Sequence, residues 1–252
     1  MYPILFTLGP LDIHSHDALI ALGVVVASLF FLKEARPAGL PWQDVMISLP
    51  LGLGVTFLCV YLSGIWIRYL TIGWVGLEVN GAYGTASFGM VLGVLLAGYL
   101  AARWRGMAVG VVLDRLALVL PLAQTFGRVG CFLEGCCYGL ETGGFLRMYL
   151  PGEAGVWAYR YPTQLVLAAF DLGLFAWLWS RRARPGPDGC QAWLYLICFC
   201  LGRLAIDALR DLPRVWGPFN PHQLTSLAIL LVIAWVALGT DRAVARRRVA
   251  RS

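Results

Sequence analysis

Seven long apolar stretches constrain this sequence more than any other feature. Each is long enough to cross about 30 Å of hydrocarbon as an α-helix. Of the 252 residues, 59% are hydrophobic and only 13% are charged, which leaves too little charge to cover a soluble protein of this size. The sequence therefore predicts an all-α, polytopic membrane protein. The seven spans are expected at residues 17–32, 44–66, 86–102, 108–126, 162–180, 191–209 and 222–239.

The distribution of Lys and Arg predicts how these spans are oriented. Basic residues are more frequent in one set of alternating loops and in the C-terminal tail than in the other set. By the positive-inside rule, the C-terminus is then cytoplasmic and the N-terminus lies outside. The same pattern explains the net charge of +6 without a nucleic-acid partner. We expect one integral membrane domain over residues 1–252, with a polar periplasmic loop region at 140–161.

The segment 127–139, after the fourth span, has an unusual composition. It holds four glycines, three cysteines, Arg128 and Glu134 in thirteen residues. Glycines at this density let the backbone approach a ligand closely or adopt a positive φ. Charged residues beside a membrane span are costly unless they are paired or used. We expect this segment to be a functional loop on the outer side of the membrane.

A second polar group lies in the sixth span. Arg203, Asp207 and Arg210 are spaced by four and three residues, so they share one face of a helix. One interpretation is an ion pair that holds helices together, because charges inside a membrane are rarely left unpaired. The other is an anion site, since the Arg side chain matches phosphate oxygens with two parallel hydrogen bonds.

The cysteines of segment 127–139 allow several interpretations. A metal site is disfavoured, because Cys131, Cys136 and Cys137 lack both a fourth ligand and the usual CxxC spacing. A disulfide in an oxidising compartment, a reactive thiol and simple packing of small side chains all remain open. No metal and no cofactor are expected.

Other polar residues are candidates at the outer ends of helices. His16, with His14 beside Asp17, is a candidate general base near neutral pH. Gln164 and Gln223 either cap their helices or line a headgroup site.

These motifs together resemble a known family. Gly127-Arg128-x-Gly130-x-Phe132-x-x-Gly135-x-x-x-Gly139 resembles the signature of prolipoprotein diacylglyceryl transferases. Further segments resemble the family in the same order along the chain: Leu8-Gly9-Pro10 with His14, Tyr161-Pro162-Thr163-Gln164-Leu165, Gly202-Arg203 with Asp207 and Arg210, and Gln223-Leu224.

The resemblance implies a reaction and a location. Such enzymes, in the bacterial cytoplasmic (inner) membrane, move the diacylglyceryl group of phosphatidylglycerol to the lipobox cysteine thiol in the signal peptide of a prolipoprotein. Arg128 and Arg203 would stabilise the departing phosphate, and Asp207 would orient Arg203. His16 or Glu134 would accept the thiol proton. The remaining residues expected to contact substrate are Gly127, Gly130, Cys131, Gly139, Gln164, Arg210 and Gln223.

The chain also departs from the family pattern. Phe88-Gly89-Met90-Val91 stands where the family has His-Gly-Gly-Leu, so the histidine often assigned as base is replaced by Phe88. Cys131 stands at the signature asparagine. Two alternatives therefore remain: a lipid-binding accessory protein without the usual base, or a transferase for a different acceptor. A redox or metal-binding protein built on the loop thiols is a third.

Overall fold

The computed structural model describes residues 1–8, 11–72, 86–152, 155–184 and 186–249. Within these ranges, seven helices are long and apolar enough to cross a membrane, which confirms the predicted all-α polytopic fold. The helices are α1 (Ser15–Ala35), α2 (Trp42–Ile72), α3 (Ala86–Arg105), α4 (Val109–Glu134), α5 (Thr163–Arg181), α6 (Cys190–Ile206) followed by the short 3-10 helix η3 (Asp207–Leu209), and α7 (Pro221–Val249).

Helix α4 is longer than expected. The sequence predicted that the fourth span ends at Phe126 and that a loop begins at Gly127, but the helix continues to Glu134. The glycines Gly127 and Gly130 therefore lie in a helix, and the turn begins only at Gly135, whose φ is 82°. The expected loop is thus half helix and half turn.

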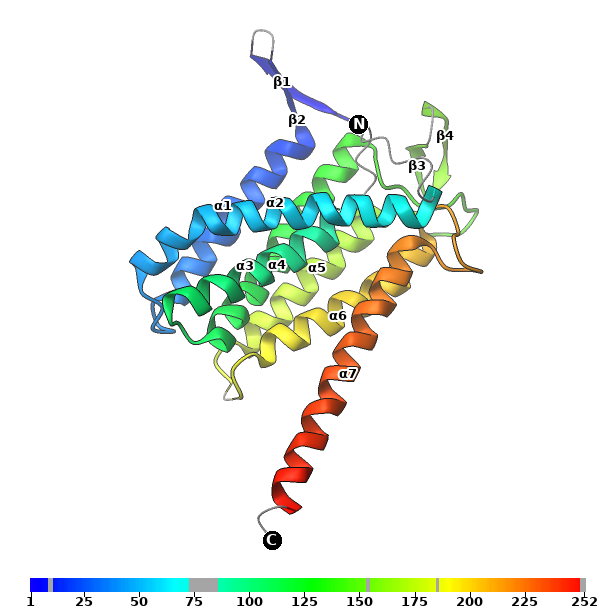
Figure 1. The fold of residues 1–252 in the computed structure, drawn as a ribbon. Helices are drawn as coiled ribbons and strands as arrows, with labels where there is room; N and C mark the ends of the chain where they lie inside the picture. The colour runs from blue at the N-terminus through cyan, green and yellow to red at the C-terminus, as the bar shows by residue number, and fades with distance from the viewer. Residues whose placement is uncertain (9–10, 73–85, 153–154, 185, 250–252) are drawn as a thin grey trace.

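The helices form a bundle around α4, which packs against α1, α3, α5 and α6. Helix α2 packs along α3, and α7 contacts mainly α6. Figure 1 shows that α7 then leaves the bundle, so that its C-terminal end lies far from the other helices. The central position of α4 explains why it contributes more buried residues than any other helix in the described chain.

Two β-hairpins gather at one end of the bundle, together with the N-terminus (Figure 1). β1 (Ile4–Leu8) pairs antiparallel with β2 (Leu11–His14), and β3 (Met148–Pro151) pairs antiparallel with β4 (Trp157–Arg160). The second hairpin lies in the predicted polar loop. We call the end of the bundle where both hairpins lie the hairpin end. The α1–α2, α3–α4 and α5–α6 connections lie at the opposite end (Figure 1).

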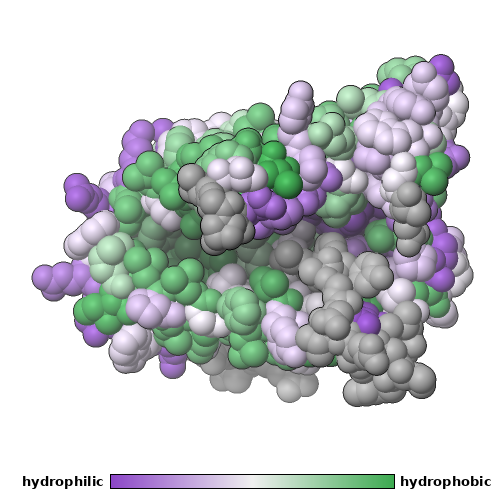
Figure 2. Space-filling view, turned by 90° about the horizontal axis from the view of Figure 1, so that it is seen from above, coloured by the Kyte–Doolittle hydropathy of each residue, from purple (hydrophilic) through white to green (hydrophobic). Residues whose placement is uncertain are grey.

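The bundle interior is apolar and its outer surface is apolar too. The main core includes Phe88, Leu118, Tyr195 and Phe199. Large apolar side chains are also exposed on the outside, as at Trp235 of α7, which is 76% exposed. Seen from above, one face has a hollow with hydrophobic residues along much of its rim (Figure 2). Apolar residues on both sides of a helix are expected where the outer side faces lipid.

Glycines set the distance between α2 and α3. A Cβ added at Gly89 would lie 2.5 Å from the Val60 Cα and 2.7 Å from the Cys59 carbonyl oxygen, so the two backbones touch there. Small residues allow this close approach of membrane helices.

We predict that Gly89→Ala destabilises the protein. The added methyl group must displace backbone, at a cost of about 1–3 kcal/mol. Gly52→Ala is the matched control, because a Cβ at Gly52 has no atom within 4 Å among the described residues. Thermal unfolding in detergent should show a lower midpoint for Gly89→Ala and an unchanged or higher one for Gly52→Ala. Equal midpoints would contradict the close helix contact.

Candidate active site

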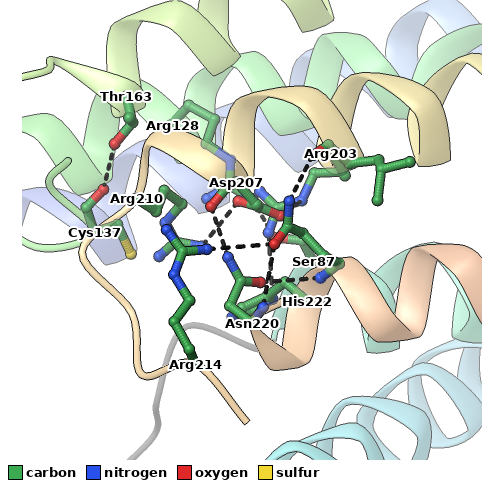
Figure 3. Close-up of polar contacts among 12 residues, drawn as sticks. Ser87, Arg128, Cys137, Thr163, Arg203, Asp207, Arg210, Arg214, Asn220 and His222 are labelled. Atoms are coloured by element: carbon green, nitrogen blue, oxygen red, sulfur yellow. Dashed lines mark hydrogen bonds and ion pairs between the residues drawn. The ribbon is translucent and has the colours of Figure 1, made fainter. Parts of the chain in front are cut away.

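A buried ion cluster lies at the hairpin end of α6. The Arg203 Nε lies 2.9 Å from the Asp207 Oδ2, and the Arg210 Nη1 lies 3.4 Å from the Asp207 Oδ1. All three side chains are at most 2% exposed. Figure 3 shows Asp207 between the two arginines. The sequence therefore predicted the residues that meet here.

The backbone of this cluster is not the continuous helix that was expected. Helix α6 ends at Ile206, η3 covers Asp207–Leu209, and Arg210 is extended. Arg203 thus lies in the last turn of α6 instead of its middle. The turn lets Arg210 form a β-bridge with Gly139, where a Cβ would lie only 2.6 Å from the Tyr161 carbonyl oxygen. Glycine is required at this crossing of three chain segments.

A third buried arginine, Arg128 of α4, lies near the cluster. It is 5% exposed, and its Nη2 donates a hydrogen bond to the Ser87 Oγ (Figure 3). Asp171 of α5 is also buried and interacts electrostatically with both Arg128 and Arg203. Three arginines here therefore face two aspartates. Even with both carboxyls ionised, the site keeps an excess of one positive charge, which favours an anion.

Arg203 also has a donor that no described residue uses. Its Nη1 is buried and lacks a hydrogen-bond partner within the residues that the structure describes. Its guanidinium lies over the Phe88 ring, 5.3 Å from the centroid. A buried, unsatisfied charged donor is costly. It is suited to an oxygen of a bound phosphate.

His222, at the start of α7, belongs to this site and was not a candidate in the sequence analysis. It is 2% exposed, its Nδ1 lies 3.4 Å from the Arg203 Nη2, and its ring stacks on Phe88 at 5.9 Å. Because Arg only donates hydrogen bonds, the Nδ1 facing it is an acceptor. In the sequence, only its place beside Gln223 at the outer end of a span could have drawn attention to it.

The two candidate glutamines make structural hydrogen bonds. The Gln223 Oε1 accepts from the Asn220 N–H at 3.1 Å, and the Asn220 Oδ1 accepts from the Gln223 N–H at 3.0 Å, which is a reciprocal cap at the start of α7. Asn220 also donates to the Asp207 carbonyl at 2.6 Å. Gln164 donates to the Cys136 carbonyl at 2.7 Å. Both glutamines therefore hold backbone that surrounds the arginines.

The other candidates from segment 127–139 lie on α4 or just after it. A Cβ at Gly130 would lie 3.1 Å from the His16 Cα, so this glycine allows α1 and α4 to approach closely. Gly127 lies on the same side, where a Cβ would be 3.8 Å from the Ile20 Cγ1. Cys131 is 7% exposed, and its thiol is electrostatically coupled to Arg128. A contact of these glycines with substrate stays a prediction.

The two candidate bases, His16 and Glu134, have partners outside the arginine cluster. The His16 Nδ1 lies 3.3 Å from the Asp17 Oδ1, and the Glu134 Oε1 lies 3.4 Å from the His14 Nδ1. Their role as proton acceptors stays a prediction.

The fold and this site define a class: a multi-pass membrane protein with a buried cationic site at one end of its helix bundle. Comparison with known proteins then identifies the family. A sequence model described as prolipoprotein diacylglyceryl transferase matches residues 3–238. The chain belongs to the prolipoprotein diacylglyceryl transferase family, and it is a transferase of lipoprotein biosynthesis.

Individual relatives agree along nearly the whole chain. A phosphatidylglycerol–prolipoprotein diacylglyceryl transferase 2 of Clostridium perfringens is 32% identical over 245 residues, which cover 88% of each chain. Phosphatidylglycerol–prolipoprotein diacylglyceryl transferases of Gloeobacter violaceus and Geobacter sulfurreducens are each 29% identical, over 90% and 95% of this chain and 88% and 95% of their own lengths. The resemblance inferred from the motifs is confirmed.

We predict that Asp207→Asn strongly destabilises the protein. It leaves Arg203 and Arg210 buried without their carboxylate, and breaking a buried ion pair from one side costs roughly 3–5 kcal/mol. Asp211→Asn is the control, because Asp211 pairs with Arg160 at 2.9 Å but is 45% exposed, where such pairs contribute about 1 kcal/mol or less. Thermal unfolding in detergent measures both. Similar losses in the two variants would contradict the central role of Asp207.

Proposed function

We propose that this protein transfers the diacylglyceryl group of phosphatidylglycerol to the lipobox cysteine thiol of a prolipoprotein, in the bacterial inner membrane. The observation that carries the proposal is the buried arginine cluster with its excess positive charge and its unused Arg203 donor. Names of relatives that contain phosphatidylglycerol and prolipoprotein support the same substrates. Glycerol phosphate would be the second product.

The proposed chemistry requires charge stabilisation at the phosphate. The thiol sulfur attacks the glyceryl carbon, the carbon–oxygen bond to phosphate breaks, and the departing phosphate gains negative charge. Arg203 and Arg128 stabilise that charge, because fixed cations in a water-poor site need little reorganisation. Asp207 holds Arg203 in position through their ion pair.

The thiol must also lose a proton. His222 is the titratable side chain packed against both Phe88 and Arg203, so its Nδ1 would lie beside a phosphate held by Arg203. We assign it as the proton acceptor in place of the histidine that the family pattern has at Phe88: a phosphate bound to Arg203 would take over the Nη2 donor, free the Nδ1 and offset the arginine charge. His16 and Glu134 are the competing candidates from the sequence.

The lipid would reach this site from the bilayer. Helix α7 begins beside the cluster and then diverges from the bundle (Figure 1), and large apolar side chains are exposed on it at Leu231, Val232 and Trp235. A diacylglycerol body could lie along such surfaces while the headgroup meets the arginines. With the N-terminus outside, the hairpin end and the site would face the periplasm, where lipobox cysteines are modified.

We predict that Arg203→Lys and Arg128→Lys each lower transferase activity by at least about 100-fold, because Lys cannot reproduce a two-point contact with phosphate. Arg147→Lys is the matched control, since Arg147 lies in the exposed loop before β3. The assay uses membranes, labelled phosphatidylglycerol and a lipobox peptide, with thioether formation as readout. Failure of the unaltered protein to form thioether, while a reference transferase is active, would overturn the proposed function.

We predict that His222→Gln changes the pH profile as well as the rate. Without a base, the reaction depends on thiolate already present, so the remaining activity should rise with pH toward the pKa of the acceptor thiol, which is about 8.5 when the thiol is free. His16→Gln and Glu134→Gln should keep the profile of the unaltered protein. If His16→Gln or Glu134→Gln shows the shifted profile and His222→Gln does not, the base is reassigned to that residue.

A further inference from the structure

Three thiols meet just after the last turn of α4. The Sγ atoms of Cys131, Cys136 and Cys137 all lie within 4.8 Å of one another, and all three side chains are free thiols. The left-handed Gly135 lets the chain fold back, so that the Cys136 N–H donates to the Cys131 carbonyl at 3.1 Å. Sequence spacing alone argued against a metal, but the turn brings the sulfurs together.

The start of α5 holds this turn in place. The Thr163 Oγ1 donates to the Cys137 carbonyl at 2.9 Å, and the Gln164 Nε2 donates to the Cys136 carbonyl at 2.7 Å. Figure 3 shows the first of these bonds. Cys137 also has a φ of 61°, a rare conformation for a residue other than glycine. The thiols are therefore positioned by two helices.

The number and spacing of the thiols suit zinc with one open position. Tetrahedral zinc with Zn–S bonds of about 2.3 Å places its sulfurs about 3.8 Å apart, so small side-chain shifts are sufficient. Structural zinc sites have four protein ligands, whereas catalytic sites have three and keep the fourth position for water or substrate. Three protein thiols, with no fourth ligand grouped with them among the residues that the structure describes, match the second kind.

The surrounding charges fit an anionic metal centre. Three thiolates with one Zn²⁺ carry a net charge of −1, and a fourth thiolate makes it −2. The Cys131 thiol interacts electrostatically with Arg128 and Arg210, and Arg128 also interacts with Cys137. These buried arginines would stabilise the anionic centre. With zinc bound and the Asp171 carboxyl protonated, the three arginines balance Asp207, the metal centre and one phosphate diester, each with a charge of −1.

We propose that Cys131, Cys136 and Cys137 bind a zinc ion whose fourth position takes the acceptor thiol as thiolate. This inference rests on the proposed function, because the thiol that would take the fourth position is the acceptor of that reaction. Zinc binding displaces the three protein thiol protons. A thiol that coordinates zinc loses its proton and remains a nucleophile close to the metal.

The step balances without any oxidant or reductant. The acceptor thiol gives its proton to a base and binds zinc through sulfur. That sulfur forms a bond with the glyceryl carbon, while the carbon–oxygen bond to phosphate breaks and its electron pair leaves with the phosphate oxygen. The thioether that forms is neutral and a weaker ligand, so it leaves the zinc.

Metal binding is tested on the full-length protein in detergent, with thiols reduced and zinc added before dialysis. We expect about one zinc ion per chain, as a single closed set of thiol ligands implies. Cys131→Ser, Cys136→Ser and Cys137→Ser should each weaken binding by more than about 10-fold, judged by competition with a chromophoric chelator. Cys190→Ser is the matched control, because Cys190 begins α6 at the opposite end of the bundle.

Cobalt substitution tests the open position. Co²⁺ in place of zinc should give sulfur-to-cobalt charge-transfer bands, and a lipobox peptide should shift the visible bands of the metal. The same peptide with Ser in place of its Cys should not. Loss of both signals in the Cys→Ser variants, with folding judged by unfolding midpoint, completes the assignment.

Any one of three results would overturn this inference. The first is a zinc content no higher than in the triple Cys→Ser variant. The second is a disulfide between any two of these cysteines in protein taken from membranes, and the third is full transferase activity after zinc is removed with the thiols intact. None of these three results contradicts the proposed function. By contrast, a zinc-loaded protein that shifts its cobalt spectrum with the peptide but never forms thioether contradicts the proposed function and leaves the metal site.

Discussion

The structure depends on one buried carboxylate. Asp207 lies between Arg203 and Arg210 at the end of an apolar bundle, where unpaired charges would not be tolerated. Its backbone carbonyl also accepts from Asn220, which caps α7, and Arg210 pairs with the strand-like segment at Gly139. One residue thereby joins the end of α6, the start of α7 and the turn after α4, and it fixes the arginine that is suited to phosphate.

The turn after α4 connects this cluster to the rest of the site. Helix α4 supplies Arg128 from its interior and Cys131 from its last turn. Beyond Gly135, the backbone carbonyls of Cys136 and Cys137 are held by the first residues of α5. Arg128 and the thiols are therefore placed by the same rigid elements. This explains how a phosphate-bearing lipid and a thiol could be brought to one place.

Two residues of the site, Phe88 and Cys131, differ from the family pattern. Phe88 replaces a histidine of the family pattern, and its ring packs against both Arg203 and His222. Cys131 stands where the family signature has an asparagine. His222 and the thiols thus lie beside the same arginines that the family motifs pointed to.

The sequence by itself determined the seven spans, the family and the grouping of Arg203, Asp207 and Arg210, because apolar length and helical spacing are local properties. It did not give the end of α4, since Gly127 and Gly130 predict a loop until α1 is packed against them. It also missed His222 and the convergence of the three thiols. Those depend on contacts between α3, α4, α5, α6 and α7, which lie far apart in the chain, and only the packing of the bundle decides them.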